Sequence, residues 1–119
     1  MNITTAWLDE KEACLQGKGW FAKRFPAGER LELVIYALFA DQALSPEKRS
    51  EWASWVMRRA GIPEGLNLPE TVGGWLYLSG CTLPEGLKLP ETVGGGLYLS
   101  GCTNVPSIPA GIMKSQIIR

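Results

Sequence analysis

Residues 62–82 read IPEGLNLPETVGGWLYLSGCT, and residues 83–103 read LPEGLKLPETVGGGLYLSGCT. The two segments are identical at 18 of 21 positions and differ only at Ile62/Leu83, Asn67/Lys88 and Trp75/Gly96. A degenerate third unit, NVPSIPAGI, follows at residues 104–112. Near-identity at a fixed period is typical of repeat proteins, in which each unit buries its apolar face against the next. The repeats therefore predict a short β-solenoid over residues 62–112.

Each repeat contains two L-x-L triplets, so leucines recur throughout this half of the chain. Successive side chains of an extended segment point to opposite sides, which places both leucines of a triplet inward and the middle residue outward. Glycine pairs and prolines between the triplets favour sharp corners. Stacked repeats would also place the cysteine of one repeat against that of the next. We therefore expect structural roles for six residues: Leu76, Leu78, Leu97, Leu99, Cys81 and Cys102.

Residues 1–61 have a different composition and are predicted to form three or four helices. A first helix is expected near Ala6–Leu15, and the nearly all-apolar segment Glu29–Ala40 predicts a buried helix. Ser45-Pro46-Glu47 is a strong helix start, because it combines a capping hydroxyl, a first-turn proline and an acidic residue at the positive end of the helix dipole. Gly61 is expected to end that helix.

Both halves resemble known sequence families. LYLSGCTNVPSIP at residues 97–109 resembles a leucine-rich repeat of the pattern L-x-L-x-x-[N/C]-x-x-[V/I/L]. LPEGL at residues 83–87 resembles an element of short bacterial leucine-rich repeats, and the segment GG-x-L-x-L-S-G-C is similar to repeats of phage and bacterial proteins. The helical half resembles a small N-terminal module, without established activity, that precedes such repeats. This second resemblance is carried by Ala13, Cys14, Gly17, Trp20, Phe21, Phe25 and Pro26.

The predicted fold class is α+β, with an N-terminal helical bundle that caps a short leucine-rich-repeat-like β-solenoid. We expect the helical cap at residues 1–61, the solenoid at 62–112 and a C-terminal tail at 113–119. Two full repeats are fewer than the roughly three that a stable repeat stack usually requires. We therefore expect the helical half to close one end of the stack and the segment Pro109–Arg119 to close the other.

The composition excludes several classes of function. The 119 residues carry 12 Lys and Arg and 12 Asp and Glu, so the net charge is zero. Non-specific nucleic-acid binding needs a basic excess, so we expect no direct nucleic-acid contact. Histidine is absent, which excludes imidazole catalysis and histidine-ligated metals. No nucleotide-binding motif or metal-ligand spacing occurs, and we expect no cofactor, no metal and no catalytic residue.

One enzymatic alternative rests on Glu70 and Glu91, which lie one repeat apart. Two carboxylates at about 5 Å from each other could act as in a retaining glycosidase. Near-identical repeats give both carboxylates the same surroundings, however, so nothing separates the pKa values of an acid and a base. We expect these residues at solvated corners and predict that the protein is not an enzyme.

The cysteines and the apolar segments of the sequence indicate the cellular compartment of the protein. Three cysteines without a CxxC pair favour a reducing, cytoplasmic compartment, which would be the host bacterial cytoplasm for a phage-encoded protein. The N-terminus has no signal-peptide pattern, and the apolar run Leu33–Ala40 is far shorter than the about 20 residues that cross a bilayer. No membrane association is therefore expected. Cys81 and Cys102 form either a redox-switchable pair or a buried thiol ladder, and Cys14 is expected in the core.

The candidate recognition site consists of aromatic side chains on one side of the repeats. Tyr77 and Tyr98 are the outward residues of the L-Y-L triplets, and Trp75 precedes Tyr77 by two positions on the same face. Tryptophan and tyrosine dominate the energetics of protein interfaces, so we predict partner binding through these three residues and Lys88, the one cation of the repeats. The alternative is that this face packs on the helical half or stacks tyrosine on tyrosine.

These features predict a non-enzymatic protein-binding module that acts through the solenoid face or through the junction with the helices. Two other functions stay open: a phage or prophage inhibitor of a host defence complex, similar to anti-CRISPR proteins, and a recognition fragment of a secreted bacterial effector. All three imply a protein partner. The oligomeric state is open, and an exposed strand edge near the C-terminus is compatible with a dimer.

Overall fold

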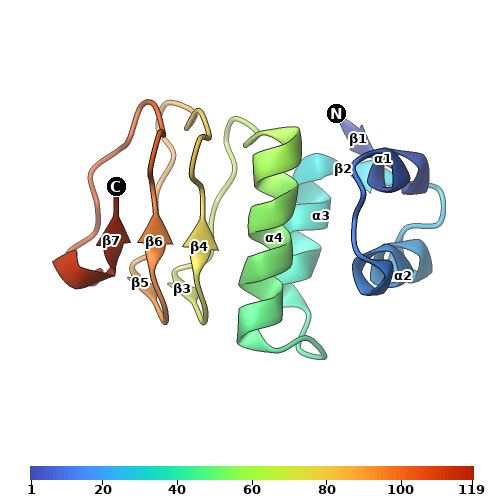
Figure 1. The fold of residues 1–119 in the computed structure, drawn as a ribbon, viewed down its shortest axis with the longest axis horizontal. Coiled ribbons are helices and arrows are strands. Elements are labelled where there is room, and N and C mark those ends of the chain that lie inside the picture. The colour runs from blue at the N-terminus through green and yellow to red at the C-terminus, as the bar shows by residue number, and fades with distance from the viewer.

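A computed structural model describes residues 1–119 (Figure 1). Four helices occupy the first half of the chain: α1 (Thr5–Glu10), α2 (Leu15–Arg24), α3 (Leu31–Ala40) and α4 (Pro46–Ala60). Seven strands of two residues each are β1 (Asn2–Ile3), β2 (Glu29–Arg30), β3 (Thr71–Val72), β4 (Leu76–Tyr77), β5 (Thr92–Val93), β6 (Leu97–Tyr98) and β7 (Ile117–Ile118). A single 3-10 turn, η1 (Lys114–Gln116), precedes β7.

The elements follow one another along the long axis of the molecule (Figure 1). From one end, β7, β6 and β4 form a parallel three-stranded sheet, α4 lies beside β4, and α3, α2 and α1 follow. β3 and β5 form a second, parallel sheet behind the first, and β1 pairs with β2 in an antiparallel sheet at the helical end. None of the four helices combines the length and the apolar character needed to cross a membrane.

Helix α4 begins and ends where the sequence predicts. The Ser45 hydroxyl accepts a hydrogen bond from the backbone N–H of Lys48 at 3.1 Å, and Pro46 occupies the first helical turn. The backbone N–H of Gly61 donates to the carbonyl oxygen of Met57, and Gly61 has a φ of 92°, which leaves the helical path. These local signals suffice because each acts within about one turn of the helix.

The first predicted helix, Ala6–Leu15, is in fact divided. Helix α1 ends at Glu10, since Glu12 adopts a left-handed conformation with a φ of 59° and the Cys14 thiol accepts a hydrogen bond from the N–H of Gly17 at the start of α2. The prediction that Cys14 lies in the core is therefore wrong, because this cysteine is exposed at a helix start. Helix α3 likewise begins later than predicted, because Glu29–Arg30 pairs with β1.

The two repeats pair in parallel at the spacing of the sequence repeat. Thr71 lies opposite Thr92, Leu76 opposite Leu97 and Tyr77 opposite Tyr98. The third strand of the larger sheet is β7, whose Ile117 and Ile118 lie opposite Leu97 and Tyr98. The C-terminal residues therefore supply the outer strand of the sheet.

The predicted fold class, a leucine-rich-repeat-like β-solenoid capped by a helical bundle, is wrong. The chain forms a small compact structure of four helices and short parallel and antiparallel sheets, and no solenoid is present. Only two full repeats are available, their strands are two residues long, and the degenerate unit at residues 104–112 forms no strand. The repeats bury their leucines in one core shared with α3 and α4, so they do not build a continuous stack of their own.

Apolar packing and a part-buried hydrogen bond join the helices to the sheet. Met57 of α4 and Leu76 and Leu78 of the first repeat are all fully buried. The backbone N–H of Tyr77 donates to the hydroxyl of Ser54 at 3.0 Å, and Ser54 is itself buried. Because an edge strand leaves backbone donors unpaired, this serine replaces the missing neighbouring strand at one position of β4.

Asp41 anchors the turn between α3 and α4. This residue is 8% exposed. Its carboxylate accepts hydrogen bonds from the Trp20 indole at 2.6 Å, the Arg24 guanidinium at 2.7 Å and the Ala43 backbone N–H at 2.9 Å. The Trp20 hydrogen bond, followed by that of Ala43 and by Arg24, holds the pKa of the Asp41 carboxyl below its usual value of 3.8, although burial acts in the opposite direction.

This arrangement predicts an acid-sensitive component of stability. The folded-state pKa of Asp41 lies below its unfolded value, so the stabilisation is complete above about pH 4 and is lost as the pH falls through the folded-state pKa. We expect Asp41→Asn to be less stable than the wild type at neutral pH and to depend less on pH in the acid range. Urea unfolding at several pH values measures both; parallel pH profiles of the two proteins would contradict the prediction. Glu64→Gln, at an exposed carboxyl, is the matched control.

Candidate functional site

Three aromatic side chains of the repeats form one cluster on the three-stranded sheet. The rings of Tyr77 and Tyr98 stack across neighbouring strands, with centroids 4.6 Å apart and planes at 11°. Trp75 extends the cluster, at 5.5 Å from the Tyr98 ring and 6.3 Å from the Tyr77 ring. Trp75 is 42% exposed and both tyrosines are half-buried. The structure therefore brings together the three aromatic residues that the sequence singles out.

The difference between Trp75 and Gly96, at equivalent positions of the two repeats, has a steric explanation. The Trp75 ring lies over Gly95 and Gly96 of the second repeat, and a Cβ added at Gly96 would lie 2.7 Å from the indole atom Cζ3. Two tryptophans could not occupy both positions, since the first ring covers the place where the second would begin. Glycine in the second repeat thus leaves room for the Trp75 indole beside Tyr98.

Arg58 of α4 adds a cation to this surface. Its guanidinium carbon lies 5.8 Å from the centroid of the Tyr77 ring, within the range of a cation–π interaction. We call Trp75, Tyr77, Tyr98 and Arg58 the aromatic face. Arg58 is not predictable as a site residue from the sequence, because the helix dipole already explains a cation near the end of a helix.

Two alternatives to partner binding were open for this face: packing on the helical half and stacking of tyrosine on tyrosine. Both apply in part. Tyr77 and Tyr98 stack on each other, and α4 covers part of Tyr77 through Arg58, while Trp75 remains open to solvent. Lys88 is exposed but belongs to another side of the repeats. Its equivalent in the first repeat, Asn67, donates its backbone N–H to the hydroxyl of Tyr36 on α3, whereas Tyr77 bonds to α4. The structure does not bring Lys88 together with the three aromatic residues.

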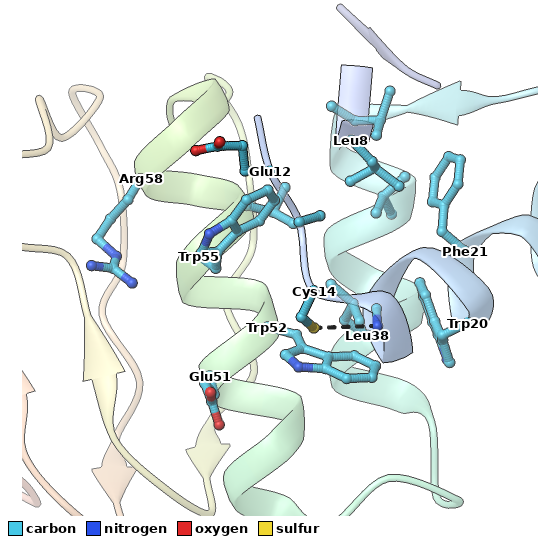
Figure 2. Close-up of a pocket in the computed structure, with 15 residues that line it drawn as sticks. Leu8, Glu12, Cys14, Trp20, Phe21, Leu38, Glu51, Trp52, Trp55 and Arg58 are labelled. Atoms are coloured by element: carbon cyan, nitrogen blue, oxygen red, sulfur yellow. Dashed lines mark hydrogen bonds between the residues drawn. The ribbon is translucent and has the colours of Figure 1, made fainter. Parts of the chain in front are cut away.

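A pocket of about 290 Å³ lies between α4 and the segment that joins α1 to α2 (Figure 2). Most of its lining is apolar. Three tryptophans line it: Trp20 from α2, and Trp52 and Trp55 from α4. Glu12, Glu51 and Arg58 supply its charged groups. Arg58 thus borders the pocket and also lies over Tyr77, so the pocket and the aromatic face meet at this residue.

The family model of the YdhT N-terminal domain matches residues 1–60. This chain belongs to the YdhT N-terminal domain family. The matched residues span all four helices and stop at the end of α4. None of the curated proteins and none of the solved structures matches the chain.

The two candidate sites divide differently between the YdhT N-terminal domain and the repeats. Every residue that lines the pocket lies between Ile3 and Arg58, inside the matched segment. The aromatic face takes Arg58 from that segment and its three rings from the repeats. The pocket is thus a feature of the YdhT N-terminal domain alone, and the aromatic face exists only where the domain and the repeats meet.

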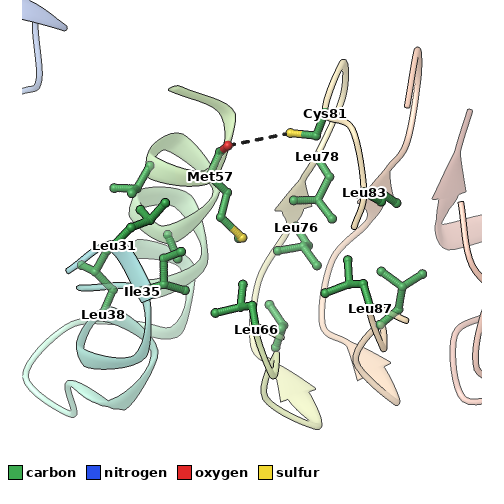
Figure 3. Packing of buried hydrophobic residues seen from close by; sticks show 14 of the residues in the cluster. Leu31, Ile35, Leu38, Met57, Leu66, Leu76, Leu78, Cys81, Leu83 and Leu87 are labelled. Carbon is green, nitrogen blue, oxygen red and sulfur yellow. Dashed lines mark hydrogen bonds between the residues drawn. The ribbon is translucent and has the colours of Figure 1, made fainter. Parts of the chain in front are cut away.

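The six residues with predicted structural roles lie in the core, with Cys102 at its edge. Figure 3 shows three of them, Leu76, Leu78 and Cys81. Both cysteines are free thiols. The Cys102 thiol donates to the carbonyl oxygen of Leu78 at 2.8 Å, and the Cys81 sulfur faces the carbonyl oxygen of Met57 at 4.0 Å. Burial, followed by the neighbouring Cys102, raises the pKa of the Cys81 thiol. A raised pKa favours the neutral thiol over the thiolate, which is the reactive form.

Two acidic residues, Glu70 and Glu91, occupy equivalent positions of the two repeats. Glu70 and Glu91 are both exposed at the corner before the short strands β3 and β5. The backbone carbonyl of Glu70 accepts the N–H of Thr92, so contact between the repeats runs through the main chain at this corner. No three cysteine, aspartate or glutamate side chains come together in a way that could hold a metal ion.

Proposed function

We propose that this chain is a non-enzymatic protein-binding module that acts through the aromatic face. The observation that carries the proposal is the continuous cluster of Trp75, Tyr77 and Tyr98, with Trp75 open to solvent and Arg58 at its edge. Tryptophan, tyrosine and arginine are the residue types that contribute most to binding energy at protein interfaces.

The fold holds the side chains of the aromatic face in place, which favours binding of a partner without a conformational change. Tyr77 and Tyr98 belong to paired strands whose leucines are buried, so their backbone positions are held by the core. Trp75 is confined between Tyr98 and the backbone of Gly95 and Gly96. Side chains that are already ordered lose little conformational entropy when a partner binds.

The charges indicate the chemistry of the partner. Arg58 is exposed and forms no ion pair with a carboxylate of this chain. A complementary partner presents an apolar side chain to the stacked rings and a carboxylate to Arg58. Such a charged hydrogen bond beside an apolar contact gives orientation as well as affinity.

Affinity measurements with variants of the aromatic face test this proposal. A partner captured from bacterial lysate is identified by mass spectrometry, purified, and titrated by calorimetry against wild type and variants. Trp75→Ala is expected to weaken binding about 30-fold or more, the effect of losing a hot spot of about 2 kcal/mol. Arg58→Ala is expected to weaken it less, and Lys88→Ala, on another side, to leave it unchanged. Equal affinities for all four proteins would refute the assignment of the site.

A further inference from the structure

The pocket of the YdhT N-terminal domain has a floor, walls and a mouth of different chemistry. Buried apolar side chains form the floor, among them Leu8, Phe21, Val34 and Leu38. Half-buried indoles form the walls, namely those of Trp20, Trp52 and Trp55. The exposed residues Glu12 and Glu51 stand at the mouth. A molecule that fills this pocket therefore contacts apolar surface at the floor and carboxylates at the mouth.

The two carboxylates at the mouth have no cationic partner. Neither Glu12 nor Glu51 forms an ion pair, while the ion pairs of the chain involve other acidic residues. Figure 2 shows Glu12 beside the Trp55 ring, where the left-handed backbone conformation of this residue places it. This conformation closes helix α1, since the N–H of Ala13 donates to the carbonyl oxygen of Leu8 and that of Glu12 to the carbonyl oxygen of Asp9.

The indoles of the walls already attract cations on the outside of the pocket. Arg24 lies 5.3 Å from the Trp20 ring centroid, Lys48 lies 5.5 Å from that of Trp52, and Arg59 lies 5.7 Å from that of Trp55. None of these three cations lines the pocket. The one cation that does, Arg58, extends from α4 toward the strands (Figure 2). Its guanidinium lies over the Tyr77 ring. Inside the pocket, the indoles and the two carboxylates have no cation to bind.

We infer that this pocket binds a small aromatic amine, with the ring on the apolar floor and the ammonium group between the indole walls and the carboxylates of Glu12 and Glu51. The volume of about 290 Å³ is about twice that of an engineered cavity that holds benzene, so one ring with a short side chain fits. Indole faces and unpaired carboxylates both attract an ammonium group, and both act more strongly where the ligand is partly removed from water.

A titration with three phenyl-containing probes of similar size and different charge tests the inference. Phenethylamine carries the ammonium group, phenethyl alcohol is neutral, and hydrocinnamate is an anion. Binding is followed by the indole N–H signals in heteronuclear NMR spectra of the full chain. Phenethylamine is expected to shift the signals of Trp20, Trp52 and Trp55 and to leave that of Trp75 unchanged. It should bind at least about tenfold more tightly than the alcohol, with the anion weakest.

Two variants separate the effect of charge from that of shape. Glu12→Gln and Glu51→Gln change exposed side chains and should leave the fold intact. Together they are expected to lower the affinity for phenethylamine about tenfold without changing that for phenethyl alcohol. Equal affinity for amine and alcohol would overturn the inference, as would shifts of the Trp75 signal in place of the pocket signals. An unchanged amine affinity in the double variant would also overturn it. None of these results depends on a protein partner, so the inference stands or falls independently of the aromatic face.

Discussion

Leu97→Ala is expected to lower the free energy of unfolding by about 2–5 kcal/mol, the range for removing a fully buried leucine from a core. Leu97 is fully buried in β6, the central strand of the larger sheet. Leu76 of β4 and Ile117 of β7 lie directly opposite it on either side. Truncation would open a cavity between three strands, and the paired backbones on both sides restrict how far the neighbours can relax into it.

Leu15→Ala provides the matched control for this measurement. Leu15 is the first residue of α2 and is 82% exposed, so the same truncation removes almost no packing there. We expect a change within about 0.5 kcal/mol, as for surface substitutions in general. Urea unfolding followed by circular dichroism gives both values. Similar losses in the two variants would show that the sheet does not carry the stability that its burial implies.

Gly94→Ala is expected to destabilise the protein by about 1–3 kcal/mol or more, the usual cost of forcing additional volume into a packed site. A Cβ at this position would overlap the carbonyl oxygen of Gly73 and lie 2.9 Å from its carbonyl carbon. Both atoms belong to the backbone, so no side-chain rotation can relieve the clash. The two repeats would have to move apart, although the N–H of Gly94 bonds to the carbonyl of Val72 at 2.7 Å.

The same substitution at Gly19 should act in the opposite direction. Gly19 lies inside α2, and a Cβ there would meet nothing within 4 Å. Alanine is favoured over glycine in a helix by about 0.5–1 kcal/mol, so Gly19→Ala is expected to stabilise the protein. Thermal or urea unfolding of both variants measures whether each substitution raises or lowers the free energy of unfolding. A neutral Gly94→Ala would mean that the repeats do not approach each other as closely as the structure indicates.

The repeats show how far periodicity can be interpreted. The sequence spacing predicts which residues pair, and the observed pairing of Leu76 with Leu97 and of Tyr77 with Tyr98 follows it. The solenoid inferred from the same spacing was wrong, since two repeats with two-residue strands bury their leucines against α4 and β7 as well as against each other. Periodicity specifies which residues are equivalent, whereas the number of repeats and their neighbours specify the architecture.

The aromatic cluster was predictable, but the pocket was not. Tyr77 and Tyr98 are equivalent residues of adjacent repeats, so their proximity follows from the repeat itself. The pocket joins Glu12 in a turn with Trp52 and Trp55 on a helix some forty residues later. Its clearest signal was composition, five tryptophans in a short chain, with three of the five converging on one cavity. Composition alone does not show which of the tryptophan rings would line a cavity.

The sequence by itself determined the features that depend on residues close together or on the repeat. The start of α4 at Ser45, its end at Gly61 and the pairing of the repeats are of this kind, because capping groups and repeated side chains act through local geometry. Tertiary structure alone decided the position of Arg58 over Tyr77, the hydrogen bond of Trp20 to Asp41 and the pairing of β7 with β6. These contacts join segments with no shared periodicity, so they follow only from how the packed helices and strands exclude water together.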